Sequence, residues 1–273
     1  MNDADHRLVA IAAEQRQVFT RPQAREAGLA QNTITRRLAD QRFVRVGACT
    51  LTFSGVNLDW RGRLQAGLLD LGAGALIAGE AAAALHGLDG YAEGPLVYLV
   101  DRRRRNARTL GDVLTSSSIA PHDRVLVDGL DVTSPTRTIV TLIGRVDRRR
   151  LGNAFDSACR MRLTTPAVID RRLDELGRRG RAGIVDYDAM RQIGEVQSWL
   201  EREFLRTIAG SGLPRPALQR TYRRDGVHIA RVDFDFAPLP IVVEVGGRRG
   251  YLSLGERQRQ ERRRNELQLL GTT

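Results

Sequence analysis

The chain has 273 residues, of which 42% are hydrophobic and 5% aromatic, with 43 basic and 32 acidic residues and a formal net charge of +11. The hydrophobic content suffices for folded cores and excludes wholesale disorder, and the scarcity of aromatic residues disfavours base-stacking proteins. Every basic residue is arginine, whose planar fork grips phosphates and guanine edges, so the positive excess favours nucleic acid as the partner.

The sequence also points to a cytoplasmic protein without a membrane segment. Cys49 and Cys159 are too few for a disulfide framework, which makes a reducing compartment the expectation. The N-terminus lacks the basic-then-apolar order of a signal peptide. The most apolar stretch, 64–88, is interrupted by Asp70 and Glu80, so we expect no membrane span.

Three helices are predicted in the first part of the chain. Apolar residues at helical spacing indicate a helix over 6–17. Thr20 and Gln23 then form the pattern of a capping box, which starts a second helix, and Gly28 is suited to end that helix in a left-handed conformation. A third helix is expected over 32–43.

Alternating residues follow directly after the third helix. The segments 43–47 and 49–53 have the alternation of a two-stranded hairpin. The order helix, helix, short turn, helix, hairpin is that of a winged helix-turn-helix. We therefore assign 1–60 as a winged helix-turn-helix DNA-binding domain.

The third helix presents the expected DNA-reading face. If Ile34 and Leu38 face the core, then Asn32 and Arg36 point away from it, with Thr33 beside them. The N-terminal half of a recognition helix enters the major groove, where asparagine pairs with adenine and arginine with guanine.

Five further residues are expected to contact the DNA backbone or to lie next to it. Arg37 lies toward the edge of the same helix, where a phosphate is a better partner than a base. Arg42 and Arg45 precede or enter the wing and are expected to clamp phosphates. Thr20 and Arg21 begin the second helix, whose N-terminal amides can bind a phosphate. A winged helix that docks only on protein is the alternative function for this domain.

Residues 61–194 mix helical and strand patterns and are assigned as a mixed α/β domain. Helices are expected over 64–71, 80–88, 135–144 and 151–161 and from Thr165-Pro166, and strands over 95–100 and 125–127. Arginine runs at 102–105, 148–150 and 178–181 are expected to be solvated loops or helix ends. The stretch 177–183 is expected to be a linker.

Residues 195–273 change pattern again. A helix is expected over 199–209, a hairpin around the Asp225-Gly226 turn, a strand over 241–245 and an arginine-rich helix over 256–270. The long helix either lies along phosphates or is a solvated amphipathic helix that packs Leu267 and Leu270 inward.

Two-thirds of the chain resembles a known family. The first part has Val18-Phe-Thr-Arg-Pro-Gln-Ala, then Gly28-Leu, Ile34, Arg37-Leu and Phe43; the middle has Gly79-Glu-Ala-Ala-Ala-Ala-Leu-His-Gly-Leu88 and Val132-Thr-Ser-Pro-Thr-Arg-Thr-Ile139. Over about 1–190 these runs resemble AbiEi-type antitoxins of type IV toxin–antitoxin systems. The resemblance implies a transcriptional autorepressor that also neutralises a nucleotidyltransferase-like toxin without durable contact.

The C-terminal pattern resembles a second family. Arg-Val-Asp233-Phe and Ile-Val-Val-Glu244-Val, in the order helix, hairpin, strand, helix, are similar to the PD-(D/E)XK core of very-short-patch-repair-like endonucleases. The resemblance implies Glu201, Asp233 and Glu244 as catalytic acids that hold Mg²⁺ or Mn²⁺. Gly246 stands where that family has a further acidic residue or a lysine, and the sequence stops before the elements expected to complete the sheet. A degenerate, truncated αβββα module is therefore expected, and Asp233 and Glu244 can instead pair with nearby arginines.

The sequence thus predicts an α+β protein: a winged helix-turn-helix, a mixed middle domain and a nuclease-like C-terminal module. The expected function is DNA-binding transcriptional regulation at its own operator, with an antitoxin role, rather than catalysis. The alternatives are a metal-dependent DNA endonuclease and a protein-interaction antitoxin that does not bind DNA. No cofactor or metal is expected unless the protein is a nuclease.

Overall fold

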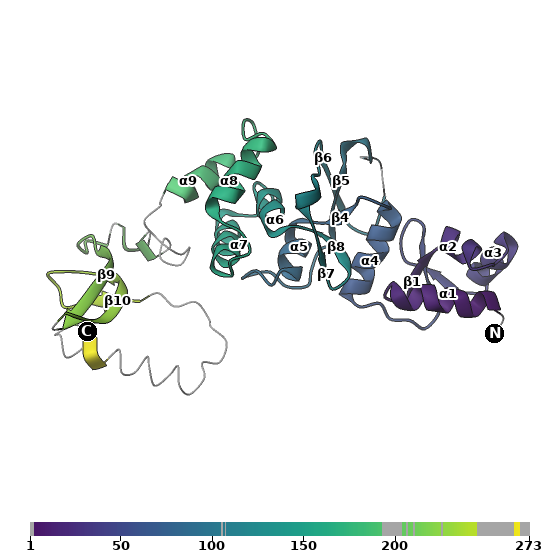
Figure 1. The fold of residues 1–273 in the computed structure, drawn as a ribbon, viewed down its shortest axis with the longest axis horizontal. Coiled ribbons are helices and arrows are strands. Elements are labelled where there is room, and N and C mark those ends of the chain that lie inside the picture. Colours follow the sequence, from purple (N-terminus) through teal and green to yellow (C-terminus); the bar gives the residue numbers. More distant parts are fainter. Residues whose placement is uncertain are drawn as a thin grey trace. The chain divides into compact units, whose positions relative to one another are not determined.

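The computed structural model describes residues 3–104, 106, 108–192, 204–205, 207–209, 211–224, 226–244 and 265–267. The chain forms two compact units, Met1–Tyr187 and Asp188–Thr273. Helices and several separate sheets are combined in it, so the protein is of the mixed α+β class, as predicted (Figure 1).

The first unit begins with three helices and a small sheet. The helices are α1 (Asp3–Glu14), α2 (Arg21–Glu26) and α3 (Gln31–Ala39), and the strands are β1 (Val18–Thr20), β2 (Phe43–Arg45) and β3 (Thr50–Phe53). The three predicted helices and the hairpin β2–β3 are present. β1 is an addition: it pairs antiparallel with β3 and gives the strand order β1-β3-β2.

Local sequence explains these elements well. Thr20 and Gln23 form the predicted capping box at the start of α2, and Gly28 takes a positive φ of 106° just after it. The rings of Phe19, Phe43 and Phe53 lie with centroids 5.0 to 5.6 Å apart in the core of this segment. Contacts of this kind stabilise the fold beyond the area that they bury.

The middle of the first unit is built on a five-stranded mixed sheet of order β6-β5-β4-β8-β7. Its strands are β4 (Leu76–Ile77), β5 (Val97–Asp101), β6 (Asp112–Ser116), β7 (Arg124–Val127) and β8 (Leu130–Thr133). The helices α4 (Trp60–Leu71) and α5 (Gly79–Leu85) share its apolar core, in which Tyr98 is the largest fully buried side chain. The short helix η1 (Arg102–Arg104) directly follows β5, and the short helix η2 (Pro121–Asp123) directly precedes β7.

Helices complete the first unit. They are α6 (Pro135–Leu142), α7 (Arg148–Arg160), α8 (Pro166–Glu175) and α9 (Ile184–Gln192), the last of which continues into the second unit. α6 packs against α5, α7 and α8, and Figure 1 shows α6, α7 and α8 on the side of the sheet away from α1–α3. The predicted helices over 135–144 and 151–161 are confirmed with shifted bounds, and the helix from Thr165-Pro166 begins where predicted.

The stretch 177–183, predicted as a linker, is instead packed at its far end. A Cβ built on Gly183 would lie 2.4 Å from the backbone nitrogen of Gly144, just after α6. Both glycines have positive φ, 78° at Gly144 and 72° at Gly183. The two backbones therefore touch, and a side chain at either position would separate them.

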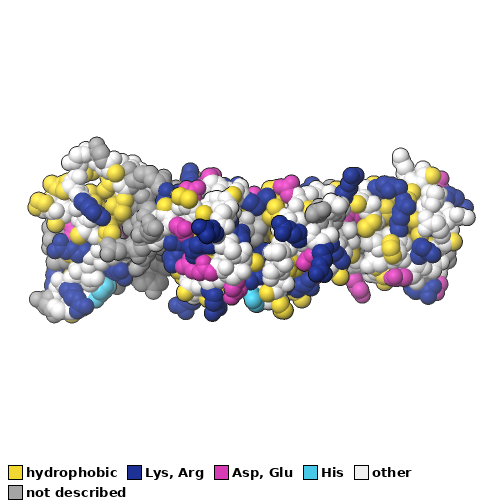
Figure 2. Space-filling model, turned by 90° about the horizontal axis from the view of Figure 1, so that it is seen from above, with side chains coloured by type: hydrophobic (Ala, Val, Ile, Leu, Met, Phe, Trp, Pro, Cys, Tyr) yellow, Lys and Arg dark blue, Asp and Glu magenta, His cyan; other side chains and the backbone are white. Residues whose placement is uncertain are grey.

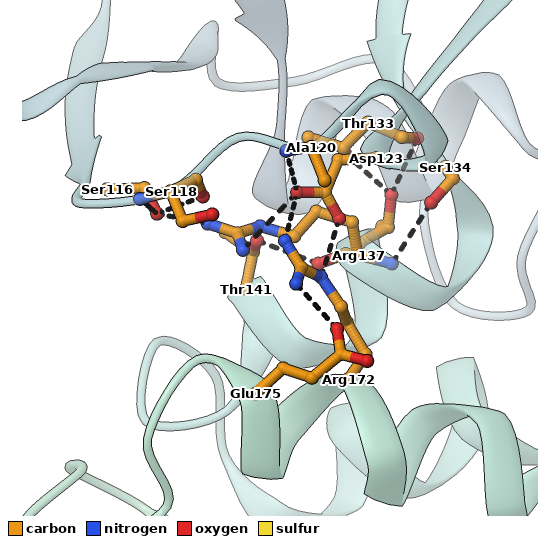
Figure 3. Close-up of polar contacts among 11 residues, drawn as sticks. Ser116, Ser118, Ala120, Asp123, Thr133, Ser134, Arg137, Thr141, Arg172 and Glu175 are labelled. Carbon is orange, nitrogen blue, oxygen red and sulfur yellow. Dashed lines mark hydrogen bonds and ion pairs between the residues drawn. The ribbon is translucent and has the colours of Figure 1, made fainter.

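A buried ion-pair network fastens α6 and α8 to the rest of the first unit (Figure 3). Arg172 donates from Nε and Nη2 to the two carboxylate oxygens of Asp123, and from Nη1 to Glu175 at 2.8 Å. Arg137 donates from Nη2 to Ser116 Oγ at 2.7 Å, and its Nη1 lies 3.7 Å from Asp123 Oδ2. Burial lowers the pKa of Arg137 to about 10, although Asp123 opposes the shift. Because these side chains pair with one another inside the fold, the network is structural.

The second unit contains an antiparallel sheet of order β11-β10-β9. Its strands are β9 (Ala217–Arg224), β10 (Val227–Asp235) and β11 (Val242–Val243), which confirms the predicted hairpin and the third strand. Ala230, Val232 and Leu267 form its buried cluster. The helices predicted over 199–209 and 256–270 fall largely outside the described residues.

None of the helices in the described part of the chain combines the length and the apolar character needed to cross a bilayer.

Candidate nucleic-acid interface

The outward face of α3 has the orientation that its spacing predicts. Ile34 is fully buried and Leu38 packs against the same core, whereas Asn32 and Arg36 are exposed. Thr33 is half-buried between the two faces. An amide and a guanidinium therefore project from the first two turns of this helix toward solvent.

Arg37 contacts the fold rather than solvent. Its Nη1 lies 2.6 Å from Asp5 Oδ1 of α1, and each of the two side chains is 18% exposed. The guanidinium carbon is also 5.3 Å from the centroid of the Phe43 ring. Arg37 thus ties α3 to α1 and β2, a role that the helical spacing alone does not reveal, and its guanidinium is engaged within the fold.

Backbone amides at the start of α2 are already hydrogen-bonded within the capping box. The backbone amide of Gln23 donates to Thr20 Oγ1 at 3.3 Å, and the amide of Thr20 donates to Gln23 Oε1 at 2.8 Å. Two of the amides expected to meet a phosphate are therefore already hydrogen-bonded, and Thr20 acts as a cap. Arg21 is half-buried and lines, with Arg25, an open pocket of about 800 Å³ between α2 and α3.

Basic residues are exposed along the hairpin, and the backbone of its tip is hydrogen-bonded to α4. Arg42 and Arg45 are exposed, as expected of phosphate-binding residues. The tip instead rests on α4, where the carboxylate of Asp70 accepts hydrogen bonds from the amides of Ala48, Cys49 and Thr50 at 2.9, 2.8 and 3.0 Å. The backbone of the hairpin tip is thus held by α4, and the side chains of Arg42 and Arg45 are exposed beside it.

Asp70 is a residue that the sequence does not single out. It lies 20 to 22 residues beyond the amides that it accepts from, so no local spacing connects them. Its surroundings also affect Cys49: burial, followed by the hydrogen bond to Asp70, raises the pKa of that thiol. A raised pKa keeps this thiol protonated at neutral pH.

The predicted nuclease acids are only partly described. Glu201 lies outside the described residues. Asp233 is half-buried in β10 and its Oδ1 accepts from Gln219 Nε2 at 3.2 Å, and Glu244 is exposed just after β11. Because Phe234 pairs with Val243, continuing that antiparallel register by one residue brings Asp233 opposite Glu244.

These two acids do not complete a metal centre in what the structure describes. No group of three or more histidine, cysteine, aspartate or glutamate side chains suited to a metal ion occurs among the described residues. The more buried neighbour, Asp235, pairs with Arg220 and accepts from the amide of Ala237 at 3.1 Å.

No protein-family model and no curated protein matches the chain. Among solved structures, the crystal structure of the RV2827C protein from Mycobacterium tuberculosis is similar in part, with 18% sequence identity and a TM-score of 0.45. The similarity covers 65% of this chain and 73% of that chain. A likeness of this degree indicates nothing about function.

Proposed function

We propose that the protein binds double-stranded DNA through a winged helix-turn-helix formed by residues 1–60, with α3 as the recognition helix and β2–β3 as the wing. The observation that carries the proposal is the exposure of Asn32 and Arg36 opposite the buried Ile34. A recognition helix places its N-terminal half in the major groove. There, Asn32 can pair with adenine and Arg36 with guanine.

The basic residues beside α3 support the same proposal. Arg42 and Arg45 are exposed, and within the described part of the chain neither forms an ion pair. Exposed guanidinium groups without acidic partners are suited to phosphates, which set the position of a protein on the duplex without reading its sequence. The net charge of +11 adds a long-range attraction to DNA.

We further propose that the DNA is the protein's own operator and that the protein acts as an antitoxin. Both points rest on the resemblance of residues 1–190 to AbiEi-type antitoxins. Binding at its own promoter would repress transcription of the operon, and the protein would neutralise a nucleotidyltransferase-like toxin without durable contact.

Binding to two duplexes of equal length, one from the protein's own promoter region and one shuffled, tests the proposal. Arg36→Ala should lose preference for the operator by roughly 5- to 150-fold, the value of one good bidentate base contact. Arg45→Ala should weaken binding to both duplexes and lower the slope of log affinity against log salt by about 1. Arg171→Ala, an exposed arginine of α8, is the matched control.

Two outcomes would contradict the proposal. If Arg36→Ala keeps the operator preference of the native protein, the assigned face of α3 is wrong. If the native protein shifts neither duplex at low salt but rescues cells from a co-expressed toxin, a protein-interaction role replaces DNA binding.

A further inference from the structure

Asp70 joins two segments that are far apart in the sequence. Its Oδ1 accepts from the amides of Cys49 and Thr50 and from Thr50 Oγ1, the last at 2.7 Å. Its Oδ2 accepts from the amide of Ala48 at 2.9 Å and from Thr109 Oγ1 at 3.2 Å. The tip of the hairpin and the segment that follows η1 therefore meet on a single carboxylate at the last turn of α4.

The approach on the hairpin side is too close for a side chain. A Cβ built on Gly47 would lie 1.9 Å from Asp70 Oδ2. On the other side, Arg104 Nη1 donates to the carbonyl of Leu71, so the segment is attached to α4 at Arg104 as well as at Thr109. These contacts hold Arg104 and Thr109 against α4, next to the tip of the hairpin.

The exposed arginines of this segment are unlike the ion-paired arginines of the first unit. Arg102, Arg103 and Arg108 are exposed, and among the described residues none of them forms an ion pair. By contrast, Arg178 pairs with Asp170 and Asp174 at 3.4 and 2.8 Å. Asp101 directly precedes these arginines, and its Oδ1 accepts a hydrogen bond from the backbone amide of Arg103 at 2.9 Å.

The surface next to these side chains is open. Asp101, Arg102, Arg103 and Ser117 line a shallow pocket of about 360 Å³. Figure 2 shows basic side chains across both the α1–α3 segment and the adjoining part of the sheet. Duplex DNA carries about one negative charge per 1.7 Å of its axis, so a duplex that passes the wing continues to present phosphates beyond it.

We propose that Arg102, Arg103 and Arg108 form a second phosphate-binding patch for duplex DNA, which contacts the backbone flanking the site read by α3. Asp70 holds Thr109, one residue after Arg108, next to the tip of the wing. The inference rests on the proposed function and extends it: the bound site is longer than a winged helix-turn-helix alone would cover, and the patch adds affinity without sequence preference.

A charge-matched pair of variants tests the patch. Arg103→Ala/Arg108→Ala removes two charges from it, and Arg171→Ala/Arg179→Ala removes two exposed charges elsewhere in the first unit. The measurements are the salt dependence of binding to the operator duplex and a hydroxyl-radical footprint. All four positions are exposed, and thermal melting verifies that both variants remain folded.

We expect the patch variant to lower the log–log salt slope by about 2 more than the control does, in line with roughly 0.9 per lost phosphate contact. It should also lose protection at one end of the footprint and keep its preference for operator over shuffled DNA. Equal slopes and footprints for the two variants overturn the patch and leave the proposed function standing, provided that Arg36→Ala still removes the preference. If the native protein binds neither duplex, both the second patch and the proposed DNA-binding function are wrong.

Discussion

Arg172 and Asp123 form a two-pronged ion pair in the interior of the first unit, with Nε 2.9 Å from Oδ1 and Nη2 bound to Oδ2. The Asp123 side chain is 1% exposed and that of Arg172 is 7% exposed. Arg137 approaches the same carboxylate at 3.7 Å. The Asp123 carboxylate thus faces two buried guanidinium groups, and Arg172, 49 residues away in sequence, also pairs with Glu175.

Asp123→Ala should lower the free energy of unfolding by about 3–5 kcal/mol, because it leaves two buried guanidinium groups without their carboxylate. Asp131→Ala is the control: its pair with Arg124 has side chains 37% and 42% exposed, and such surface pairs contribute about 0–1 kcal/mol. Urea denaturation of both variants measures the difference. Similar losses for the two would show that burial does not set the value of the Asp123 pair.

The first turn of α3 offers a stabilising change. Ala30 is the N-cap, with extended backbone at φ −65° and ψ 148°, and its side chain makes no capping hydrogen bond. Ala30→Ser should stabilise the protein by about 0.5–1 kcal/mol by providing an acceptor for an amide of that turn. The same substitution at exposed Ala39, at the other end of α3, should give no gain. Denaturation midpoints of the two variants decide the matter.

His86 should make the stability of the protein sensitive to mild acid. Its Nε2 lies 2.7 Å from the carbonyl oxygen of Thr133, and burial lowers its pKa below the ordinary 6.5, with the backbone carbonyl opposing the shift. As the pH falls below 6.5, the unfolded chain binds a proton that the folded chain does not, so stability decreases.

His86→Gln should therefore lose less stability than the native protein between pH 7.5 and pH 5.5, and exposed His122→Gln serves as the control. Melting temperatures at the two pH values provide the measurement. If His86→Gln and the native protein lose the same stability on acidification, the titration of this histidine is not linked to unfolding.

The C-terminal sheet leads to a prediction about cleavage. Because Gly246 stands where a PD-(D/E)XK centre has a further acidic residue or a lysine, supercoiled plasmid should remain uncut in Mg²⁺ and in Mn²⁺. Agarose gels over a range of metal concentrations provide the measurement. Nicking that disappears in Glu244→Ala but persists in Asp235→Asn would contradict this and assign a nuclease site to the sheet.

Features fixed by neighbouring residues could be predicted from the sequence. The capping box of Thr20, the positive φ of Gly28 and the outward orientation of Asn32 and Arg36 depend on contacts within a turn or two. Helical periodicity therefore sufficed to locate the candidate recognition face. The exposure of Arg36 and its proposed pairing with a base are separate matters, and only the first is a property of the fold.

Features that depend on distant partners could not be predicted. β1 and β4 have three and two residues, too few to show an alternation, and they form because β3, β5 and β8 offer backbone partners. Asp70 has no local pattern because its partners lie on a hairpin and on a segment after η1. The engagement of Arg37 with Asp5 likewise depends on how α1 and α3 meet.

The backbone contact between Gly144 and Gly183 bears on how the chain can be divided for expression. A fragment that ends before 183 would remove one half of that contact and would also lose Tyr187, which is fully buried and donates to Asp170 Oδ1 at 2.7 Å. An affinity tag or protease site inserted next to Gly183 would disturb the same contact. A soluble N-terminal fragment should therefore extend past Tyr187.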